Sequence, residues 1–456
     1  MELGRYDPPF DEAAVRAVVE RLPREWLRSR RWFGEKSQRI ERISMAGCAT
    51  LSDRPRVALA LLDVTYEGGG SSSYVLPLLF ELEGTVREAV DSPEYQRLLF
   101  DLLAGGAEQG PVRFEPFVEL PAETGEPRVL PVEQSNTSIA YGREWILKMF
   151  RKLVYGPNRD LEVGRFLTTE ARFAHTPQVA GAISYDGRAT LGVLQRFVAN
   201  QGDGWSYVLE QLASLREQAP NAPDDVYWAQ DGLPDRGEAL LRDLERLGHI
   251  TGEMHQALAS RPDLPDFAPE PCTDADARAW VDDLERQRSQ ALASAGNVDL
   301  PDDLRRELPA AALLERAAAA APNAQKIQIH GDYHLGQVLK TAEGFVIIDF
   351  EGEPARSLEE RRAKQPALRD VAGMLRSIDY ASASAGQETD EWAREAGRRF
   401  VAGWRAGSGQ RLDEELLRLF QLSKAFYELR YELNNRPDWV HVPLRGLVNL
   451  LQELDS

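Results

Sequence analysis

With 456 residues, the chain is too long for one ordinary domain, and its 43% hydrophobic content can bury a sizeable core. A formal net charge of −19 disfavours nucleic acid or an anionic membrane as a partner, because both are bound by clustered Lys and Arg. The sequence contains no recognisable secretion signal and no apolar run long enough to span a bilayer. Cys48 and Cys272 stand far apart in no metal-binding spacing, which favours free thiols and a cytoplasmic protein.

The first ninety residues are expected to form a small α+β cap, residues 1–90. An amphipathic helix is predicted over 10–22, with Asp11 as its N-cap. Two strand-like runs, 57–66 and 74–80, are joined by a Gly/Ser turn. The segment WLRSRRWFGEK between the helix and these strands places Trp beside Arg, which is typical of a packed corner.

A strand-rich part is expected over 91–200. It opens with a helix that begins at Pro93. Lys148 stands in the apolar run WILKMF, where an ammonium is unfavourable unless it is paired. Glu162, in the helix that follows, is suitably spaced for the strand-lysine to helix-glutamate ion pair of kinases. The alternative is an edge-strand lysine with its ammonium in water.

Two further segments of this part are candidates for nucleotide contacts. Small polar residues at 133–138 would let backbone amides approach phosphate oxygens, although without glycines they do not define a phosphate loop by themselves. Strands are predicted at 179–184 and 189–198, and the end of the second would form a hinge that offers backbone donors and acceptors to adenine. The residues predicted to bind the nucleotide are Lys148, Glu162, Ser135, Asn136, Thr137, Ser138, Gln195 and Phe197.

Residues 201–456 are predicted to be mainly helical. Long runs of period 3.6 cover 238–258 and 276–293, and the Ala-rich run 310–321 is a good helix former. Three more helices are expected near 366–377, 390–406 and 412–434.

The stretch from 328 to 354, QIHGDYHLGQVLKTAEGFVIIDFEGEP, organises this helical part. A polar loop is followed by two short apolar runs, which predicts a loop and a β-hairpin. The hairpin would bring Asp332, Gln337 and Asp349 to one side, where three hard oxygen donors suit Mg²⁺.

Phosphoryl transfer needs this arrangement of groups. One carboxylate orients the attacking hydroxyl, while an amide and a second carboxylate hold the metal that bridges the nucleotide phosphates. The pattern H-G-D-x-x-x-x-Q followed by Asp349 has the order of the kinase catalytic loop and metal segment, with Gln337 in place of the usual Asn. Asp332 is therefore the predicted catalytic base, and Gln337 and Asp349 are the predicted metal ligands. The alternative is that both Asp residues only cap turns.

The last predicted helix supplies a candidate sugar site. Lys424, Tyr427, Glu428 and Tyr431 fall on one helix face, where charged groups, hydroxyls and aromatic planes would hold a sugar. The alternative is that the tyrosines belong to the core. With the loop histidines and nearby polar residues, the predicted substrate contacts are His330, His334, Glu351, Lys424, Tyr427, Glu428, Tyr431 and Arg436.

Together these segments resemble one known family. The resemblance to bacterial maltokinase rests on SRRWFG, QSNTS, HGDYHLGQVL, IDFEGEP, ERR, LRDVAGMLRS, KAFYELRYELNNRPDW and PLR, and it is strongest from residue 328 onward. It implies an α+β, bilobal, eukaryotic-protein-kinase-like fold, similar to aminoglycoside phosphotransferases, with an N-terminal cap. It also implies ATP- and Mg²⁺-dependent phosphorylation of maltose at the anomeric hydroxyl. The maltose 1-phosphate formed would feed α-glucan synthesis, with trehalose synthase as a pathway partner.

The resemblance assigns roles by motif. Asp332 matches the catalytic base, Gln337 and Asp349 match the Mg²⁺ ligands, and Lys148 with Glu162 matches the phosphate-binding lysine and its partner. Actinobacterial glucosamine kinases are similar, so an amino-sugar or aminoglycoside-like kinase is the alternative, with Glu351, Glu353 and Glu428 as anionic contacts. A third alternative is a non-catalytic kinase-fold partner.

Overall fold

The computed structural model describes residues 2–6, 9–131, 136–218, 235–296, 298, 300–306, 308–386 and 391–454. The chain divides into two compact units. The first comprises Met1–Arg165 and Pro177–Ala199, and the second comprises Phe166–Thr176 and Asn200–Ser456. None of the described helices combines the length and the apolar character that crossing a bilayer requires.

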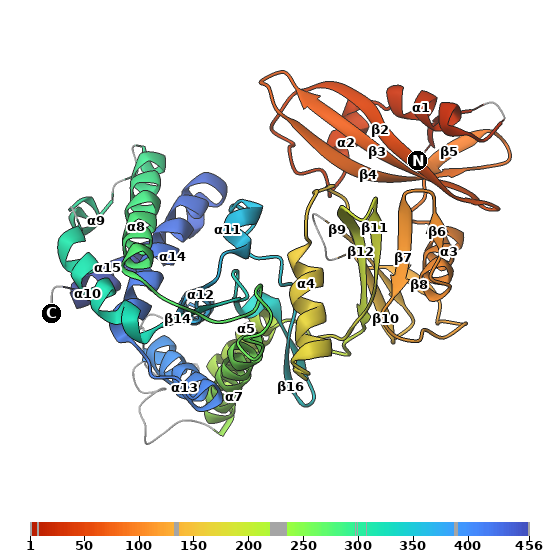
Figure 1. The fold of residues 1–456 in the computed structure, drawn as a ribbon. Coiled ribbons are helices and arrows are strands. Elements are labelled where there is room, and N and C mark those ends of the chain that lie inside the picture. The colour runs from red at the N-terminus through yellow and green to blue at the C-terminus, as the bar shows by residue number, and fades with distance from the viewer. Residues whose placement is uncertain are drawn as a thin grey trace. The chain divides into compact units, whose positions relative to one another are not determined.

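A five-stranded antiparallel sheet forms the N-terminal part of the first unit (Figure 1), with strand order β1-β5-β4-β3-β2. Helix α1 packs on β2 and β3. The predicted N-cap is confirmed, because a side-chain oxygen of Asp11 accepts a hydrogen bond from the Ala14 amide at 3.0 Å. The elements are β1 (Glu2–Arg5), α1 (Glu12–Glu20), α2 (Arg24–Ser29), β2 (Ile40–Asp53), β3 (Arg56–Tyr66), β4 (Ser71–Phe80) and β5 (Thr85–Glu88).

In this part of the chain, the sequence predicted the packed corner around α2 but not strand β2. The packed corner is confirmed: Trp26 and Trp32 are buried, and the Arg30 guanidinium lies 4.9 Å from the Trp26 ring centre. Strand β2 was not predicted, because its pairing with β3 shifts register three times and its sequence has no regular alternation.

A seven-stranded antiparallel sheet forms the rest of the first unit, with strand order β6-β7-β11-β12-β10-β9-β8. It shares one hydrophobic core with the five-stranded sheet, since Leu59 and Leu61 of β3 pack with Leu99 of α3 and Leu147 of β10. The two sheets therefore form one unit. The elements are α3 (Pro93–Ala104), β6 (Glu108–Gln109), β7 (Val112–Pro116), β8 (Pro127–Val129), β9 (Asn136–Tyr141), β10 (Trp145–Phe150), α4 (Arg159–Arg165), β11 (Val179–Tyr185) and β12 (Ala189–Arg196).

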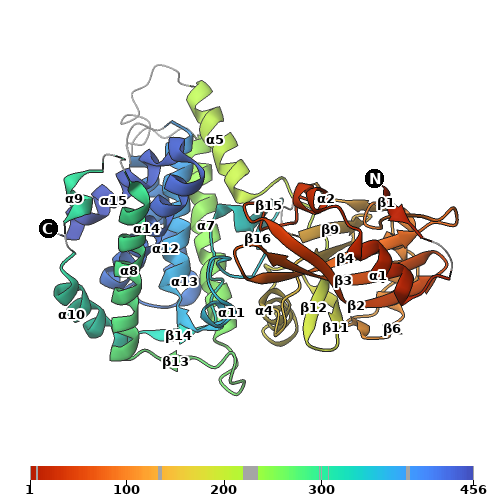
Figure 2. The same ribbon diagram turned by 90° about the horizontal axis from the view of Figure 1, so that it is seen from above.

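The second unit is mainly helical. Helix α14 packs against both α8 and α12, as Figure 2 shows. Its longer elements are α5 (Gly204–Gln218), α7 (Asp235–Leu258), α8 (Asp274–Ala295), α10 (Ala310–Ala320), α12 (Leu368–Ser384), α13 (Glu391–Ser408), α14 (Glu414–Asn435) and α15 (His441–Leu454). Its shorter elements are η1 (Phe166–Glu170), β13 (Glu270–Pro271), α9 (Asp302–Arg305), η2 (Ala321–Asn323), β14 (Gln325–Ile327), η3 (Leu335–Gln337), β15 (Val338–Thr341), β16 (Gly344–Ile347), α11 (Leu358–Arg362), β17 (Gln365–Pro366) and η4 (Pro437–Trp439).

Helices α7 and α13 touch backbone to backbone. A Cβ atom on Gly403 would lie 1.8 Å from the Glu245 carbonyl oxygen, and one on Gly407 would lie 2.1 Å from the His249 carbonyl oxygen. The close approach therefore needs glycine at both positions. It brings the side chains of α13 within reach of α7.

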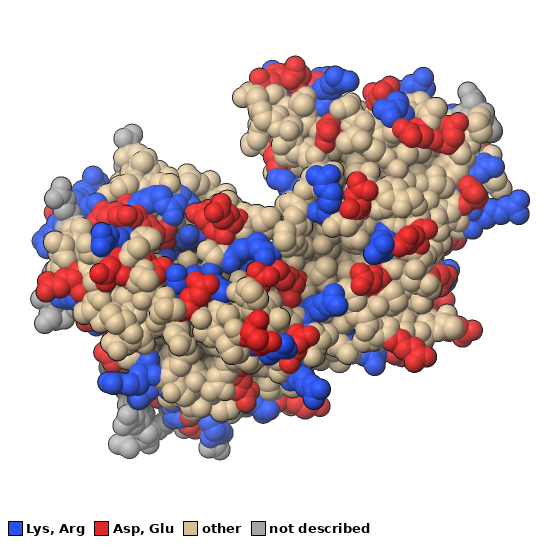
Figure 3. All heavy atoms as spheres, viewed as in Figure 1, with Lys and Arg blue, Asp and Glu red and all other residues tan. Residues whose placement is uncertain are grey.

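The predicted helices and the predicted hairpin of this unit are confirmed. Residues 338–341 and 344–347 pair as the antiparallel strands β15 and β16. The sequence did not predict α15, because Pro443 stands inside this segment, although it falls in the first turn of the helix, where proline is tolerated. On the face of the molecule drawn in Figure 3, acidic and basic side chains are interspersed.

Candidate active site

The loop between β14 and η3 is held by hydrogen bonds from the His330 ring and from two of its backbone amides. The His330 ring is fully buried and donates from Nε2 to the Ile348 carbonyl oxygen at 3.0 Å, which ties the loop to the residue before Asp349. The amides of His330 and Gly331 donate to the two carboxylate oxygens of Asp370 at 2.7 and 2.9 Å. Gly331 has a φ of +87°, a conformation that favours glycine. These bonds determine where Asp332 lies.

Asp370 is itself held by a buried chain of side chains. The His255 Nε2 atom lies 3.1 Å from an Asp370 carboxylate oxygen, and the Trp404 indole donates to His255 Nδ1 at 3.0 Å. An indole N–H can only donate, so Nδ1 accepts and the ring proton sits on Nε2. The chain therefore runs from α13 through α7 and α12 to the loop of Asp332.

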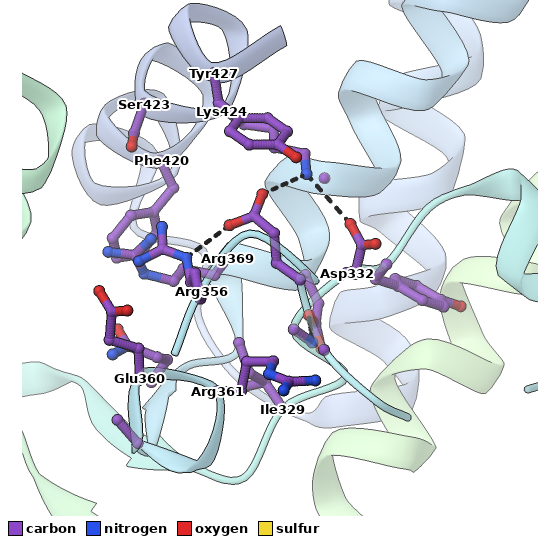
Figure 4. Close-up of a pocket in the computed structure, with 18 of the residues that line it drawn as sticks. Ile329, Asp332, Arg356, Glu360, Arg361, Arg369, Phe420, Ser423, Lys424 and Tyr427 are labelled. Carbon is purple, nitrogen blue, oxygen red and sulfur yellow. Dashed lines mark hydrogen bonds and ion pairs between the residues drawn. The ribbon is translucent and has the colours of Figure 1, made fainter. Parts of the chain in front are cut away.

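Asp332 lies beside the cation of Lys424. The ammonium is 3.3 Å from a carboxylate oxygen of Asp332 and 3.2 Å from one of Glu353, as Figure 4 shows. Burial raises the pKa of Asp332, but Lys424, with His334 and His330, more than offsets this and holds the pKa below its usual value. Burial lowers the pKa of Lys424, but the carboxylates of Glu353 and Asp332 outweigh burial. They raise the pKa above its usual value and keep the amine charged.

The ion pairs continue from Glu353 to Asp283 of α8 and Arg369 of α12. The other Glu353 oxygen accepts from the Arg356 Nε atom at 2.6 Å, and Arg356 also lies 3.2 Å from Asp283. The Asp283 carboxylate accepts from Ser423 at 3.2 Å and lies 3.4 Å from Arg369. Burial raises the pKa of Asp283, but Arg369 and Arg356 outweigh that effect and lower it. From Asp332 outward, acidic and basic side chains therefore alternate in one connected series of ion pairs.

The two predicted metal ligands lie together. The Gln337 amide is 3.2 Å from an Asp349 carboxylate oxygen, and an Asp349 oxygen lies within 4.8 Å of a Glu351 oxygen. Asp349 has a φ of +67°, which is unusual for a residue with a side chain and is found where function imposes strain. An amide and two carboxylates are hard oxygen donors, so these residues fit Mg²⁺. The sequence placed Glu351 with the substrate, whereas the structure brings it beside a predicted metal ligand.

A pocket is lined by Asp332 and other residues of the second unit. Among the predicted substrate residues it includes Lys424 and Tyr427, and the Lys424 ammonium lies 4.7 Å from the Tyr427 ring centre. The other lining residues are Gln287, Ile329, Gly331, Tyr333, Gly352, Glu353, Arg356, Glu360, Arg361, Ala363, Gln365, Arg369, Asp370, Gly373, Phe420 and Ser423.

The rest of the predicted sugar face on α14 does not line this pocket. Glu428 forms an ion pair at 2.9 Å with the buried Arg376 of α12, and its pKa is raised, chiefly by burial. Tyr431 is 45% exposed, so it is not a core residue either. Arg436 pairs with Glu432 and lies 5.4 Å from the Tyr431 ring centre. Sugar contacts of Glu428, Tyr431 and Arg436 stay predictions.

The two loop histidines have structural roles. His330 is the loop anchor described above. The His334 Nδ1 atom accepts from the Gly336 amide at 3.1 Å and caps the turn η3. Burial lowers the pKa of His334 and more than offsets the opposing effect of the Asp332 carboxylate. Contact of either ring with substrate stays a prediction.

In the first unit, Lys148 is paired. Its ammonium lies 3.2 Å from Asp160 of α4, and the side chains are only 12% and 2% exposed. This excludes the alternative of an edge-strand lysine in water. Asp160 stands two positions before the predicted partner, so a Lys148–Glu162 pair remains a prediction.

The structure corrects the prediction of a phosphate loop at residues 136–138. Asn136, Thr137 and Ser138 belong to strand β9 and pair with β10, where Ser138 lies opposite Lys148. The Thr137 hydroxyl accepts from the buried Arg151 at 3.4 Å. These residues form a strand because apolar residues follow them directly. Ser135 lies outside the described residues.

The predicted hinge is partly occupied by protein contacts. The Phe197 amide donates to the Glu144 carbonyl at 2.7 Å, so this donor is not available to adenine. Gln195 lies within β12, opposite Ile146 of β10. Its contact with nucleotide remains a prediction.

Sequence reasoning missed several residues of the site, namely Asp283, Arg356, Arg369, His255 and Trp404. All except Arg356 lie far along the chain from Asp332. Asp370 stands in the segment LRDVAGMLRS, where an acid in an otherwise apolar helix start is the signal that could have found it.

Comparisons with known proteins agree with this architecture. A model described as "Phosphotransferase enzyme family" matches residues 227–420, and one described as "Maltokinase N-terminal cap domain" matches residues 26–91. A glucosamine kinase from Streptacidiphilus jiangxiensis is 26% identical over 84% of this chain and 87% of its own. One from Mycolicibacterium smegmatis is 26% identical over 72% of this chain and 80% of its own.

A solved structure has the same fold. A glucosamine kinase in complex with glucosamine, ADP and inorganic phosphate aligns with a TM-score of 0.67 at 22% identity, covering 92% of this chain and 96% of that one. The chain therefore has the kinase-like α+β fold, and its residues 227–420 are similar to the phosphotransferase enzyme family. More particularly, residues 26–91 are similar to the N-terminal cap domain of maltokinase.

Proposed function

We propose that this protein is an ATP-dependent sugar kinase that phosphorylates maltose at its anomeric hydroxyl to give maltose 1-phosphate. The choice of a neutral sugar rests on one observation: the carboxylates in the pocket already have hydrogen-bond or ion-pair partners within the protein. An ammonium group on an acceptor needs an anion to bind, and a buried anion that already has cationic partners offers little further attraction.

Each of the four carboxylates on the described pocket lining has a partner. Lys424 contacts both Asp332 and Glu353, and Arg356 takes the second oxygen of Glu353. Asp370 accepts from two loop amides, and Glu360 accepts from the Ser357 amide at 2.8 Å. The pocket therefore suits hydroxyl groups better than an ammonium.

The transfer follows from the residues around Asp332. The anomeric oxygen attacks the γ-phosphorus of ATP, the bond to ADP breaks, and Asp332 orients the hydroxyl and receives its proton. With its pKa held low, Asp332 takes the proton late, as the new bond forms. Gln337, Asp349 and Glu351 would hold Mg²⁺, which when bound neutralises phosphate charge. Maltose 1-phosphate would then serve α-glucan synthesis, with trehalose synthase as a partner in a cytoplasmic pathway.

Glucosamine is the second candidate acceptor. The observation that favours it is the similarity to two glucosamine kinases at 26% identity. An aminoglycoside would need the same anionic contact. For an amino sugar, Glu351, Glu353 or Glu428 must be available to an ammonium, and Glu353 and Glu428 already pair with Lys424, Arg356 and Arg376.

Acceptor identity is tested with the purified chain, ATP and Mg²⁺. ADP release would be followed with maltose, glucose, glucosamine and kanamycin, and ³¹P NMR would locate the phosphoryl group on the product. We expect the highest kcat/KM with maltose and a phosphate on the anomeric oxygen. A higher kcat/KM with glucosamine would overturn the maltose assignment.

A further inference from the structure

The pocket beside Asp332 holds a group of polar atoms that the protein leaves unpaired. Gln287 Oε1, Gln365 Oε1, Arg361 Nε and Arg369 Nε are all buried, and none has a hydrogen-bond partner among the described residues. All four side chains line the pocket. They come from α8, β17, α11 and α12, so the group is assembled only by folding.

Leaving these atoms unpaired is unfavourable. A buried donor or acceptor without a partner destabilises a protein by about 1–3 kcal/mol. The neighbouring atoms of the same side chains are already used: Arg361 donates from Nη1 to the Glu351 carbonyl at 3.2 Å, and Arg369 Nη1 lies 3.4 Å from Asp283. The two arginines are thus held in place while the Nε–H group of each is still to be satisfied.

The set combines acceptors and donors. An ammonium group can only donate, so it cannot satisfy the two arginine N–H groups, whereas a sugar hydroxyl both donates and accepts. The Phe420 ring packs against Arg369, whose guanidinium carbon lies 4.6 Å from the ring centre, and so supports that arginine. The chemistry therefore matches a second, uncharged, hydroxylated ring.

Position separates this group from the reacting centre. Figure 4 shows Arg369 and Arg361 set apart from Asp332, with the Lys424 and Arg356 ion pairs lying between Asp332 and Arg369. A hydroxyl held at Asp332 and a group held by these arginines therefore belong to different parts of the acceptor.

We propose that Gln287, Gln365, Arg361 and Arg369 form a subsite for the non-reacting ring of a disaccharide. This inference rests on the proposed sugar-kinase function and deepens it: the acceptor has two rings, one at Asp332 and one at this subsite. Specificity for a disaccharide over a monosaccharide then comes from hydrogen bonds that a single ring leaves unmade.

The test uses Gln287→Met and Gln365→Met in the full chain, because each removes an acceptor at nearly constant size. Each should lower kcat/KM for maltose about three- to tenfold, the effect of one lost neutral hydrogen bond, and leave kcat/KM for glucose and KM for ATP unchanged. Gln421→Met, on α14 away from this pocket, is the matched control and should change none of the three. Melting temperatures show whether each variant is folded.

The outcomes separate this inference from the proposed function. If the unaltered protein prefers glucosamine to maltose and glucose, the proposed acceptor is wrong. If it prefers maltose but both variants lower the maltose and glucose constants equally, or leave both unchanged, these residues hold only solvent or scaffold and the subsite is refuted.

Discussion

The Lys424 ammonium lies 3.3 Å from a carboxylate oxygen of Asp332, although one residue is on α14 and the other on the loop before η3. This ion pair is expected to influence the pH dependence of activity. The proposed transfer uses Asp332 in its ionised form, and Lys424 is the group that most strongly opposes the effect of burial on the pKa of Asp332. We expect Lys424→Met to move the acid limb of the kcat/KM profile to higher pH, because burial still raises the pKa and the attraction is gone.

The stability of the fold also depends on the ionisation of Asp332, and it too is highest where the carboxyl is ionised. Since the folded pKa of Asp332 lies below its unfolded value of about 3.9, the pair stabilises the fold above that pH and loses its contribution as pH falls through the folded value. The exposed Lys36 supplies a control, Lys36→Met, whose profile should match that of the unaltered protein. Coincident acid limbs for Lys424→Met and the unaltered protein would show that Lys424 does not set the pKa of Asp332.

Asp332→Asn should retain the fold and the affinity for nucleotide while lowering turnover about a hundredfold or more, since an amide cannot accept the hydroxyl proton. ADP release at saturating maltose measures the effect, and nucleotide titration measures the affinity. The exposed acid Asp302 gives the control Asp302→Asn. Turnover within tenfold of the unaltered protein would remove Asp332 from the role of base.

Asp349→Asn tests the metal site without changing the backbone, because Asn adopts a positive φ more readily than most residues. We expect the Mg²⁺ concentration for half-maximal activity to rise about tenfold or more, since a charged ligand is lost. Asp349→Ala should add the strain of the +67° conformation and so be less stable than Asp349→Asn. An unchanged Mg²⁺ titration for both variants would mean that Asp349 is not a ligand.

Arg356→Gln should relax the discrimination between neutral and amino sugars. The variant frees one oxygen of Glu353, the one that now accepts from Arg356 at 2.6 Å, and so gives an ammonium a place to bind. We expect the ratio of kcat/KM for glucosamine to that for maltose to rise about tenfold, which corresponds to about 1.4 kcal/mol. Lys36→Met again serves as the control. A constant ratio in a folded Arg356→Gln protein would show that charge neutralisation does not select the acceptor.

Gly403→Ala should destabilise the second unit. The added methyl group would stand 1.8 Å from the Glu245 carbonyl oxygen, so α7 and α13 must separate, at about 1–3 kcal/mol. The separation also pulls Trp404 away from His255. Gly34→Ala is the control, because a Cβ atom there meets nothing within 4 Å. Equal unfolding free energies in denaturant titrations of the two variants would contradict the close packing.

Local patterns predicted much of the fold and part of the site. Asp11 caps α1 as its sequence context indicates, and the period of 3.6 residues located the long helices. The loop and hairpin bring Gln337 and Asp349 together because they flank the paired ends of strands β15 and β16. The error at Asn136–Ser138 arose because polar residues in a buried strand resemble a loop when the neighbouring strand is not known.

The amino-acid order alone was sufficient for the long helices other than α15 and for the sequence-local pair of Gln337 and Asp349, because those contacts are set by helix period and hairpin register. The contacts of Lys424 with Asp332, and of Trp404 with His255, required the tertiary structure. Each joins side chains from separate helices or loops, and the spacing of residues along one element does not specify which turn of a distant helix will face it. Burial then makes the pairing selective, because a charged or polar group removed from water is stable only beside the partner that packing supplies.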